Sequence, residues 1–134
     1  MTQRSEVRAG RALLLVDHGS RAGEANAVIE EAARALRQAR PDWVIEIAHM
    51  EIATPDIPAG LEACAAAGAR EIIVQPWFLG PGRHIRETIP NAVAEAAAQH
   101  PDLAIRVVEP FGPDPKLIEI VLERAETAHR EAGV

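Results

Sequence analysis

Two kinds of hydrophobic pattern alternate along the chain, and their order predicts the fold. Residues 12–16 form an unbroken apolar run between charged residues, which is typical of a strand buried on both faces. From residue 22 to residue 40, apolar positions recur three and four residues apart, which indicates an amphipathic helix. The alternation continues toward the C-terminus, with strands expected at 43–51, 71–78 and 103–108, and helices at 54–67, from the end of the 75–84 loop to about 99, and at 116–132.

This order predicts an α/β fold, a single-domain doubly wound βαβαβαβα arrangement with a four-stranded, mostly parallel sheet and helices on both faces. The charged residue Glu46 indicates that 43–51 is an edge strand. One domain is expected to span residues 1–134, with residues 1–11 as a flexible N-terminus.

Four strands are few for a doubly wound sheet, so an uncovered face or edge is expected to pair with a second copy. Trp77 and Phe78 lie just after the third strand. They place the expected homodimer interface near the carboxyl ends of the strands. The alternative is that both aromatic side chains pack inside one chain.

Composition narrows the classes of function. The chain of 134 residues has a formal charge of −6, and its basic residues are scattered, which argues against a nucleic-acid partner. The polar residues 1–11 and the short run after them resemble neither a signal peptide nor a membrane span, so a cytoplasmic protein without a membrane partner is expected. The single cysteine, Cys64, lies in an alanine-rich helical pattern, which favours a small buried residue over a nucleophile.

Three residues that bind metals or transfer protons follow successive predicted strands. His18 follows the first strand, Glu51 ends the second, and His84 ends the proline- and glycine-rich loop after the third. Because the carboxyl ends of parallel strands share one edge of a sheet, these side chains are expected to gather there. Two imidazoles and a carboxylate suit a divalent ion such as Fe²⁺, Co²⁺, Ni²⁺ or Zn²⁺, or a paired acid and base.

These residues also have purely structural interpretations. His18 could orient a turn, with Gly19 and Ser20 only starting the following helix. Glu51 could be a solvated or ion-paired carboxylate at a strand end. His49 shares a strand face with Glu51 and could reach the same cleft, although a half-buried histidine bonded to the backbone is the simpler expectation.

Several motifs together resemble a known family. Residues 18–21, 50–58 and 109–115, and above all 78–84 followed by Ile89-Pro90, are similar to the small class II tetrapyrrole chelatases, the short CbiX-like sirohydrochlorin chelatases. The resemblance covers nearly the whole chain. It implies a lyase, a sirohydrochlorin cobaltochelatase or ferrochelatase, that inserts Co²⁺, Fe²⁺ or the related Ni²⁺ into a tetrapyrrole in cobalamin or sirohaem biosynthesis. The metal ion is then a substrate, no organic cofactor is implied, and chains this short are expected to form homodimers.

The resemblance also implies roles for individual residues. His18 and His84 match histidines that handle the metal or accept protons, and Glu51 matches a carboxylate that assists proton removal or guides the metal. Sirohydrochlorin carries acetate and propionate groups, which an acidic protein must bind with local cations and helix N-termini. The expected substrate-binding residues beside the histidines are Ser20, Arg21, Arg83 and Arg86.

Three positions depart from the family pattern. Asp17 stands where glycine is common, His49 where the residue is more often apolar, and Thr88 where an acidic residue is frequent. Two other functions would use the same residues: a non-catalytic carrier of a metal or tetrapyrrole, and a phosphoryl-handling enzyme with His18 as the nucleophile. Asp17 disfavours the phosphoryl enzyme, because an arginine is expected immediately before its histidine.

Overall fold

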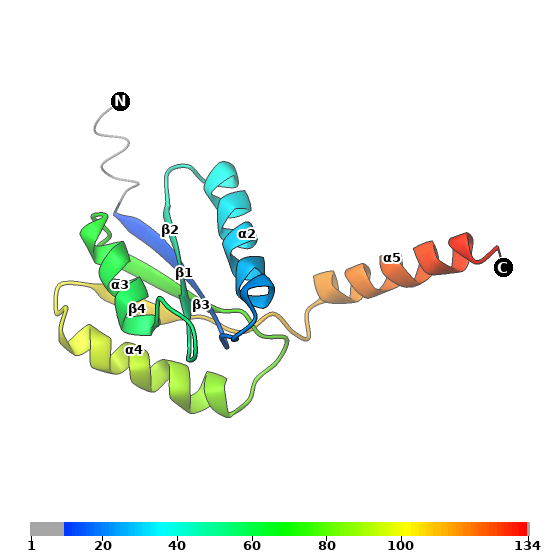
Figure 1. The fold of residues 1–134 in the computed structure, drawn as a ribbon. Helices are drawn as coiled ribbons and strands as arrows, with labels where there is room; N and C mark the ends of the chain where they lie inside the picture. Colours follow the sequence, from blue (N-terminus) through cyan, green and yellow to red (C-terminus); the bar gives the residue numbers. More distant parts are fainter. Residues whose placement is uncertain (1–9, 134) are drawn as a thin grey trace.

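The computed structural model describes residues 10–133, which form a parallel sheet with helices between the strands (Figure 1). In chain order the elements are β1 (Arg11–Asp17), α2 (Gly23–Ala39), β2 (Val44–His49), α3 (Ile57–Ala66), β3 (Glu71–Pro76), the π-helical turn η1 (His84–Thr88), α4 (Ile89–Ala98), β4 (Ala104–Val107) and α5 (Pro115–Glu131). The predicted βαβαβαβα order is confirmed. Of the segment 1–11 that was expected to be flexible, residues 1–9 lie outside the described residues.

The strand order is β2-β1-β3-β4, and every neighbouring pair is parallel. β1 is an inner strand, and its Leu14, Leu15 and Val16 side chains are at most 1% exposed, as the unbroken apolar run predicts. β2 lies at the edge, as expected from Glu46. All carboxyl ends of the strands consequently meet at one rim of the sheet.

Two apolar clusters lie on opposite faces of the sheet because neighbouring residues of a strand point to opposite sides. On one face, α3 and α4 pack against a cluster that includes Leu14 and Ile72. On the other, Ile29 of α2 packs with Leu15 and Ile45. The core therefore has α3 and α4 on one face and α2 alone on the other.

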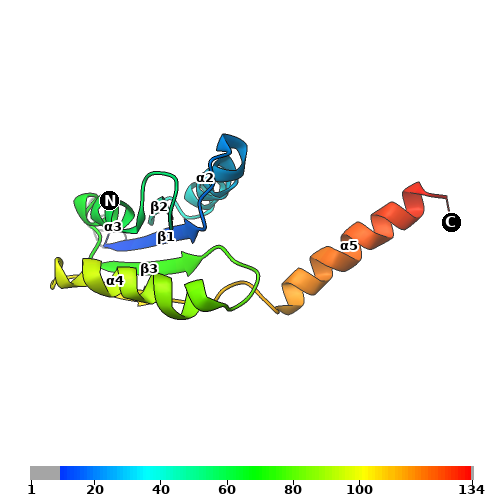
Figure 2. The same cartoon turned by 60° about the horizontal axis from the view of Figure 1, so that its bottom comes forward.

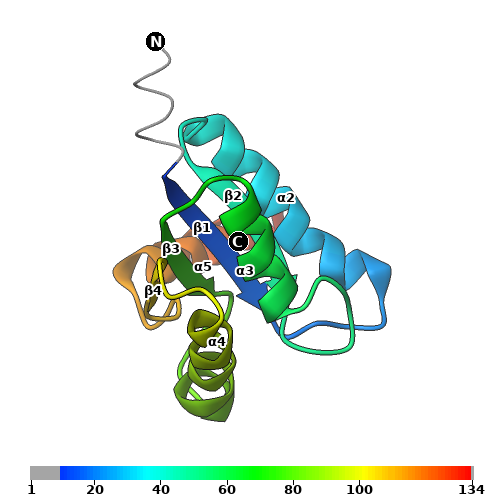
Figure 3. The same ribbon diagram turned by 90° about the vertical axis from the view of Figure 1, so that its left-hand side faces the viewer.

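α5 is the exception to the expected arrangement of helices on both faces. It extends away from the sheet in Figures 1 and 2, and in Figure 3 it lies behind the sheet, apart from α2, α3 and α4. None of its residues is buried. In the part of the chain that the structure describes, no helix combines the length and the apolar character needed to cross a membrane.

The aromatic residues after β3 pack inside the chain. Trp77 lies against the α2-side cluster and meets the ring of Phe111 edge to face, with the ring centroids 4.7 Å apart. Phe78 packs against the cluster on the opposite face. Both side chains thus pack within one chain, as the alternative noted from the sequence expects, and both remain half-buried. The homodimer interface near the carboxyl ends of the strands stays a prediction.

Candidate functional site

The turn after β1 lies directly against the turn after β2. The amide of Met50 donates to the carbonyl of Asp17 at 2.8 Å, and the amide of Glu51 donates to the carbonyl of His18 at 3.1 Å. Gly19 has φ +93°, and a Cβ at this position would overlap the Glu51 carbonyl oxygen. Only glycine combines this backbone conformation with so close an approach, so Gly19 allows His18 and Glu51 to lie side by side.

His18 and Glu51 form the centre of the candidate site. Nε2 of His18 lies 3.1 Å from Oε1 of Glu51, and Nδ1 lies 3.1 Å from the carbonyl oxygen of Gly19. The two side chains remain 47% and 55% exposed, so the pair is open to a ligand. Both ring nitrogens face oxygen acceptors. This arrangement suits a ring with two protons, or a neutral ring that donates from Nδ1 and offers Nε2 to a cation.

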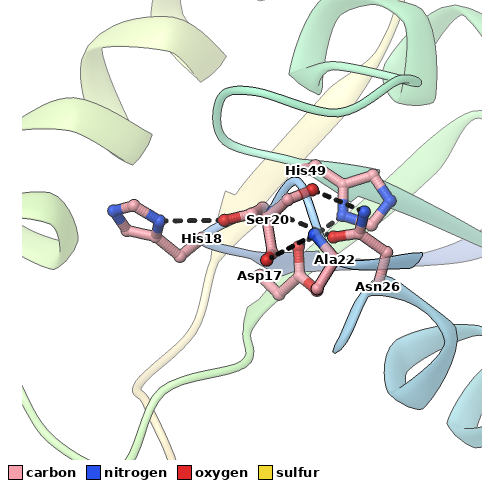
Figure 4. A network of polar contacts seen from close by, with 7 residues as sticks. Asp17, His18, Ser20, Ala22, Asn26 and His49 are labelled. Atoms are coloured by element: carbon pink, nitrogen blue, oxygen red, sulfur yellow. Dashed lines mark hydrogen bonds and ion pairs between the residues drawn. The ribbon is translucent and has the colours of Figure 1, made fainter. Parts of the chain in front are cut away.

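Asp17 and His49 form a second, buried pair beneath this turn. Nδ1 of His49 lies 2.6 Å from Oδ1 of Asp17, and His49 is only 2% exposed. The expectation of a half-buried histidine bonded to the backbone was wrong, because the carboxylate of the neighbouring strand supplies the partner of the ring. Figure 4 shows His18 directed away from this pair. His49 therefore supports the turn from below.

The pairing of Asp17 with His49 links two of the departures from the family pattern. The two residues are direct neighbours in the register of β1 and β2. A carboxylate and an imidazole at these positions satisfy each other, whereas either alone would leave a largely buried polar group without a partner. The sequence showed both departures, but their connection required the strand register.

Ser20 and Asn26 fix the start of α2. The Ser20 hydroxyl accepts from the Ala22 amide at 3.0 Å. The Asn26 side chain bonds both backbone groups of Ser20, at 2.9 Å to its amide and 2.7 Å to its carbonyl (Figure 4). Sequence analysis missed Asn26. The available signal was a side-chain amide in the first turn of a helix, next to a loop with candidate site residues.

The other predicted site residues lie on or near η1 and on the first turn. The backbone of His84 begins η1, and the side chain of His84 lies outside the described part of the structure. Arg21, Arg83 and Arg86 are exposed, and Nε of Arg83 lies 3.8 Å from a carboxylate oxygen of Glu87. π-Helical turns are frequent at functional sites.

The described side chains bring two of the three predicted metal ligands together. Among them, no group of three or more His, Cys, Asp or Glu could hold a metal ion. The structure thus unites His18 with Glu51 and leaves the third predicted ligand, His84, as a prediction.

Cys64 has no part in the site. Its side chain is fully buried in the α3 and α4 cluster. Burial, with a smaller contribution from the nearby carboxylate of Glu46, raises the pKa of the Cys64 thiol to about 12. The expectation of an inert buried cysteine is confirmed, because a thiol with this pKa is not a nucleophile near neutral pH.

Comparison with known proteins identifies relatives along most of the chain. The CbiX family model matches residues 12–128. The sirohydrochlorin ferrochelatase of Arabidopsis thaliana chloroplasts is 35% identical over 114 residues, covering 85% of this chain and 51% of that protein. The sirohydrochlorin cobaltochelatase of Methanococcus maripaludis is 32% identical over 140 residues, covering 85% of this chain and 96% of that protein.

A solved structure shares the fold. The crystal structure of the sirohydrochlorin chelatase SirB from Bacillus subtilis subspecies spizizenii, in complex with cobalt, superposes with a TM-score of 0.75 and 34% identity, covering 87% of this chain and 50% of that one. The chain spans about half the length of the plant and Bacillus relatives and nearly the whole of the archaeal one. Because the matching family model includes the His18 turn, the Glu51 turn, η1 and most of α5, the chain belongs to the CbiX family.

Proposed function

We propose that this chain is a sirohydrochlorin chelatase, a lyase that inserts a divalent metal ion into the tetrapyrrole. The observation that carries the proposal is the exposed pair of His18 and Glu51, with Nε2 and Oε1 3.1 Å apart at the carboxyl rim of the sheet. Relatives across the chain are named for this activity with iron or cobalt. The metal ion is a substrate, and the proposal includes no organic cofactor.

The geometry of His18 suits a histidine that receives a cation. A neutral ring that donates from Nδ1 to the Gly19 carbonyl leaves the lone pair of Nε2 facing Glu51. Histidines that bind metals commonly hold the other ring nitrogen on a backbone carbonyl in this way. Imidazole and carboxylate accept Co²⁺, Fe²⁺ and Ni²⁺ alike, in an order set by the metal, so supply selects the metal in the cell.

The reaction also requires a route for protons. Metallation removes two pyrrole N–H protons, while the cation exchanges water for the ring nitrogens. A site with few protein ligands leaves coordination positions open for this exchange. Glu51 is proposed to accept a proton or to guide the ion, which its exposed carboxylate beside His18 supports. His84 is proposed as the second imidazole on the basis of its place at the start of η1.

The proposed substrate is a polyanion, and the protein itself is acidic. Arg21, Arg83 and Arg86, which are exposed around the turn and η1, are proposed to bind its carboxylates. Ser20 is proposed to contribute its hydroxyl hydrogen, since the oxygen already accepts from Ala22. The proposal further comprises a cytoplasmic homodimer without a nucleic-acid or membrane partner.

The test is an anaerobic absorbance assay with sirohydrochlorin and Co²⁺, Fe²⁺ or Ni²⁺. Wild type should accelerate metallation, and Glu51→Gln should bind the macrocycle but lose turnover at least tenfold. Glu95→Gln, which changes an exposed carboxylate on α4, is the matched control and should keep full turnover. His18→Ala and His84→Ala should each abolish activity while preserving the fold.

Each failure has a distinct meaning. If wild type binds sirohydrochlorin or metal but never exceeds the spontaneous rate, the chain is a carrier and the proposal is wrong. Unchanged turnover in Glu51→Gln would remove Glu51 from the site. Full activity in His84→Ala would remove the second imidazole.

A further inference from the structure

Exposed apolar side chains gather at the carboxyl rim of the sheet. In the described part of the chain, four large apolar side chains outside α5 are exposed, and three of them follow strand ends. Ile52 follows β2, Leu79 follows β3 and Val108 follows β4, and they are 60%, 74% and 38% exposed. The fourth, Val28, lies on α2. Single exposed apolar residues are ordinary on a protein surface, whereas a group of them beside a candidate site indicates a contact surface.

Ile52 combines this exposure with backbone strain. The Ala53 amide donates to the Glu51 carbonyl at 2.8 Å, which closes a three-residue turn around Ile52. With φ 73° at its central residue, this is the rare and strained form of the γ-turn. A β-branched residue at positive φ is an outlier, and outliers of this kind are frequent at ligand sites. The fold itself gains neither burial nor a relaxed backbone from isoleucine at this position.

Leu79 is the counterpart of Ile52 in the turn after β3. Each is the third residue after the end of its strand. The Phe111 amide donates to the Phe78 carbonyl at 2.9 Å, and a Cβ at Gly112 would overlap the Leu79 carbonyl oxygen. The backbone at Leu79 is therefore packed in place while its side chain remains in solvent. A side chain presented on a fixed backbone loses little conformational freedom when a ligand covers it.

The strand order places these two residues on either side of His18. β1 lies between β2 and β3, so the turn that carries His18 lies between the turns that carry Ile52 and Leu79. Adjacent strands are about 4.8 Å apart, which separates β2 from β3 by about 10 Å. Two exposed apolar side chains thus flank the exposed pair of His18 and Glu51.

We propose that Ile52 and Leu79 form an apolar contact for the face of the tetrapyrrole. The inference rests on the proposed function and names the part of the substrate that these side chains bind. A cation reaches the nitrogens of a flat macrocycle through its face, so that face must lie over His18 and Glu51 during metallation. The acetate and propionate groups project from the edge of the ring, where arginines can bind them. The face of the ring is apolar, and apolar side chains cover it without the loss of hydration that a charged group would suffer.

Such a contact also accounts for isoleucine in the strained turn. Asparagine or glycine at position 52 would relieve the strain but would offer the ring much less apolar surface. Burial of the isoleucine side chain under the ring offsets the strain that the free protein carries. Ile52 and Leu79 are therefore substrate-contact residues beside the proposed metal-binding pair.

The first test is a titration of the full chain with sirohydrochlorin in the absence of metal, followed by absorbance. Ile52→Ala and Ile52→Leu both keep a Cβ at positive φ, so they differ mainly in apolar area. Ile52→Ala should raise the Kd at least about fivefold, whereas Ile52→Leu should stay within about twofold of wild type. Leu79→Ala should weaken binding as Ile52→Ala does. Val28→Ala removes an exposed apolar side chain from α2 and is the matched control, with an unchanged Kd.

The second test separates a substrate contact from a structural role. Ile52→Ala should raise KM and leave kcat within about twofold, because the ring contacts this side chain both before and during metallation. Ile52→Asn should bind sirohydrochlorin at least about fivefold more weakly even though its urea midpoint rises as the strain is relieved. A lower kcat with an unchanged Kd would show that Ile52 only positions Glu51, and would overturn the proposal.

Other results would also refute the two-sided contact. An unchanged Kd in either alanine variant, or equal weakening by Ile52→Leu and Ile52→Ala, would show that the ring does not rest on these side chains. Sedimentation equilibrium of the same variants checks the other possible occupant, a second copy of the chain. A lower oligomeric mass with an unchanged Kd would assign Ile52 and Leu79 to contacts between copies instead.

These outcomes are distinct from a failure of the proposed function. A wild type that binds sirohydrochlorin through both side chains but never exceeds the spontaneous rate of metallation would contradict the activity alone. An active wild type whose Kd neither alanine variant changes would contradict the apolar contact alone. A wild type that binds no sirohydrochlorin would contradict both.

Discussion

The conformation of Gly19 permits a quantitative test of how the candidate site is held together. Gly19→Ala brings two separate penalties. The residue has φ +93°, where an L-residue is strained by about 1–2 kcal/mol. The new methyl would also overlap the Glu51 carbonyl oxygen, and relieving an overlap of this kind costs about 1–3 kcal/mol. The expected loss in the free energy of unfolding is therefore about 2–5 kcal/mol.

Two other glycines separate these penalties. Gly68 has φ +98° but no neighbour within 4 Å of an added Cβ, so Gly68→Ala measures the strain alone and should cost about 1–2 kcal/mol. Gly82 has neither a positive φ nor a neighbour within 4 Å. Gly82→Ala should change the free energy of unfolding by no more than about 0.5 kcal/mol.

Urea denaturation of the three variants and wild type provides the free energies, since a domain of this size usually unfolds in one step. The chelatase assay then measures whether each variant keeps its turnover, and so whether the site is intact. Gly19→Ala should lose turnover, because the Glu51 turn must move away from His18 to admit the methyl group. If Gly19→Ala is no less stable than Gly68→Ala and keeps its turnover, the overlap with Glu51 is not what the structure implies.

Three further predictions concern neighbouring features. His49→Leu should lower the free energy of unfolding by about 1–3 kcal/mol, because it leaves the Asp17 carboxylate without its partner. The double mutant with Asp17→Ala should lose less than the sum of the two single losses, and additive losses would contradict the pairing. Ile52 has φ 73°, which strains a β-branched residue, and its side chain is 60% exposed, so Ile52→Asn should raise the free energy of unfolding by about 1 kcal/mol. A lower urea midpoint in this variant would contradict the strain at Ile52. Cys64 should resist a thiol reagent at pH 8 in the native protein, because at a pKa of about 12 only about one thiol in ten thousand is ionised, and it should react once urea unfolds the chain. Rapid labelling of Cys64 in the folded protein would disprove this expectation.

The sequence alone was sufficient for the order of strands and helices. The unbroken apolar run of β1 and the helical spacing of α2 are local signals, and they depend only on which side chains can be buried. The edge position of β2 also followed from a local feature, the charge of Glu46. The meeting of His18 and Glu51 was predictable for the same reason, because each directly follows a strand of a parallel sheet.

The tertiary structure decided what depends on contacts between distant segments. The bond between Asp17 and His49 joins residues 32 positions apart, and only the register of β1 with β2 makes them neighbours. The periodicity of α5 predicted a helix but not its direction, because an apolar stripe specifies that a surface must be covered and not which surface covers it. The structure shows that α5 extends away from the sheet with none of its residues buried (Figure 1).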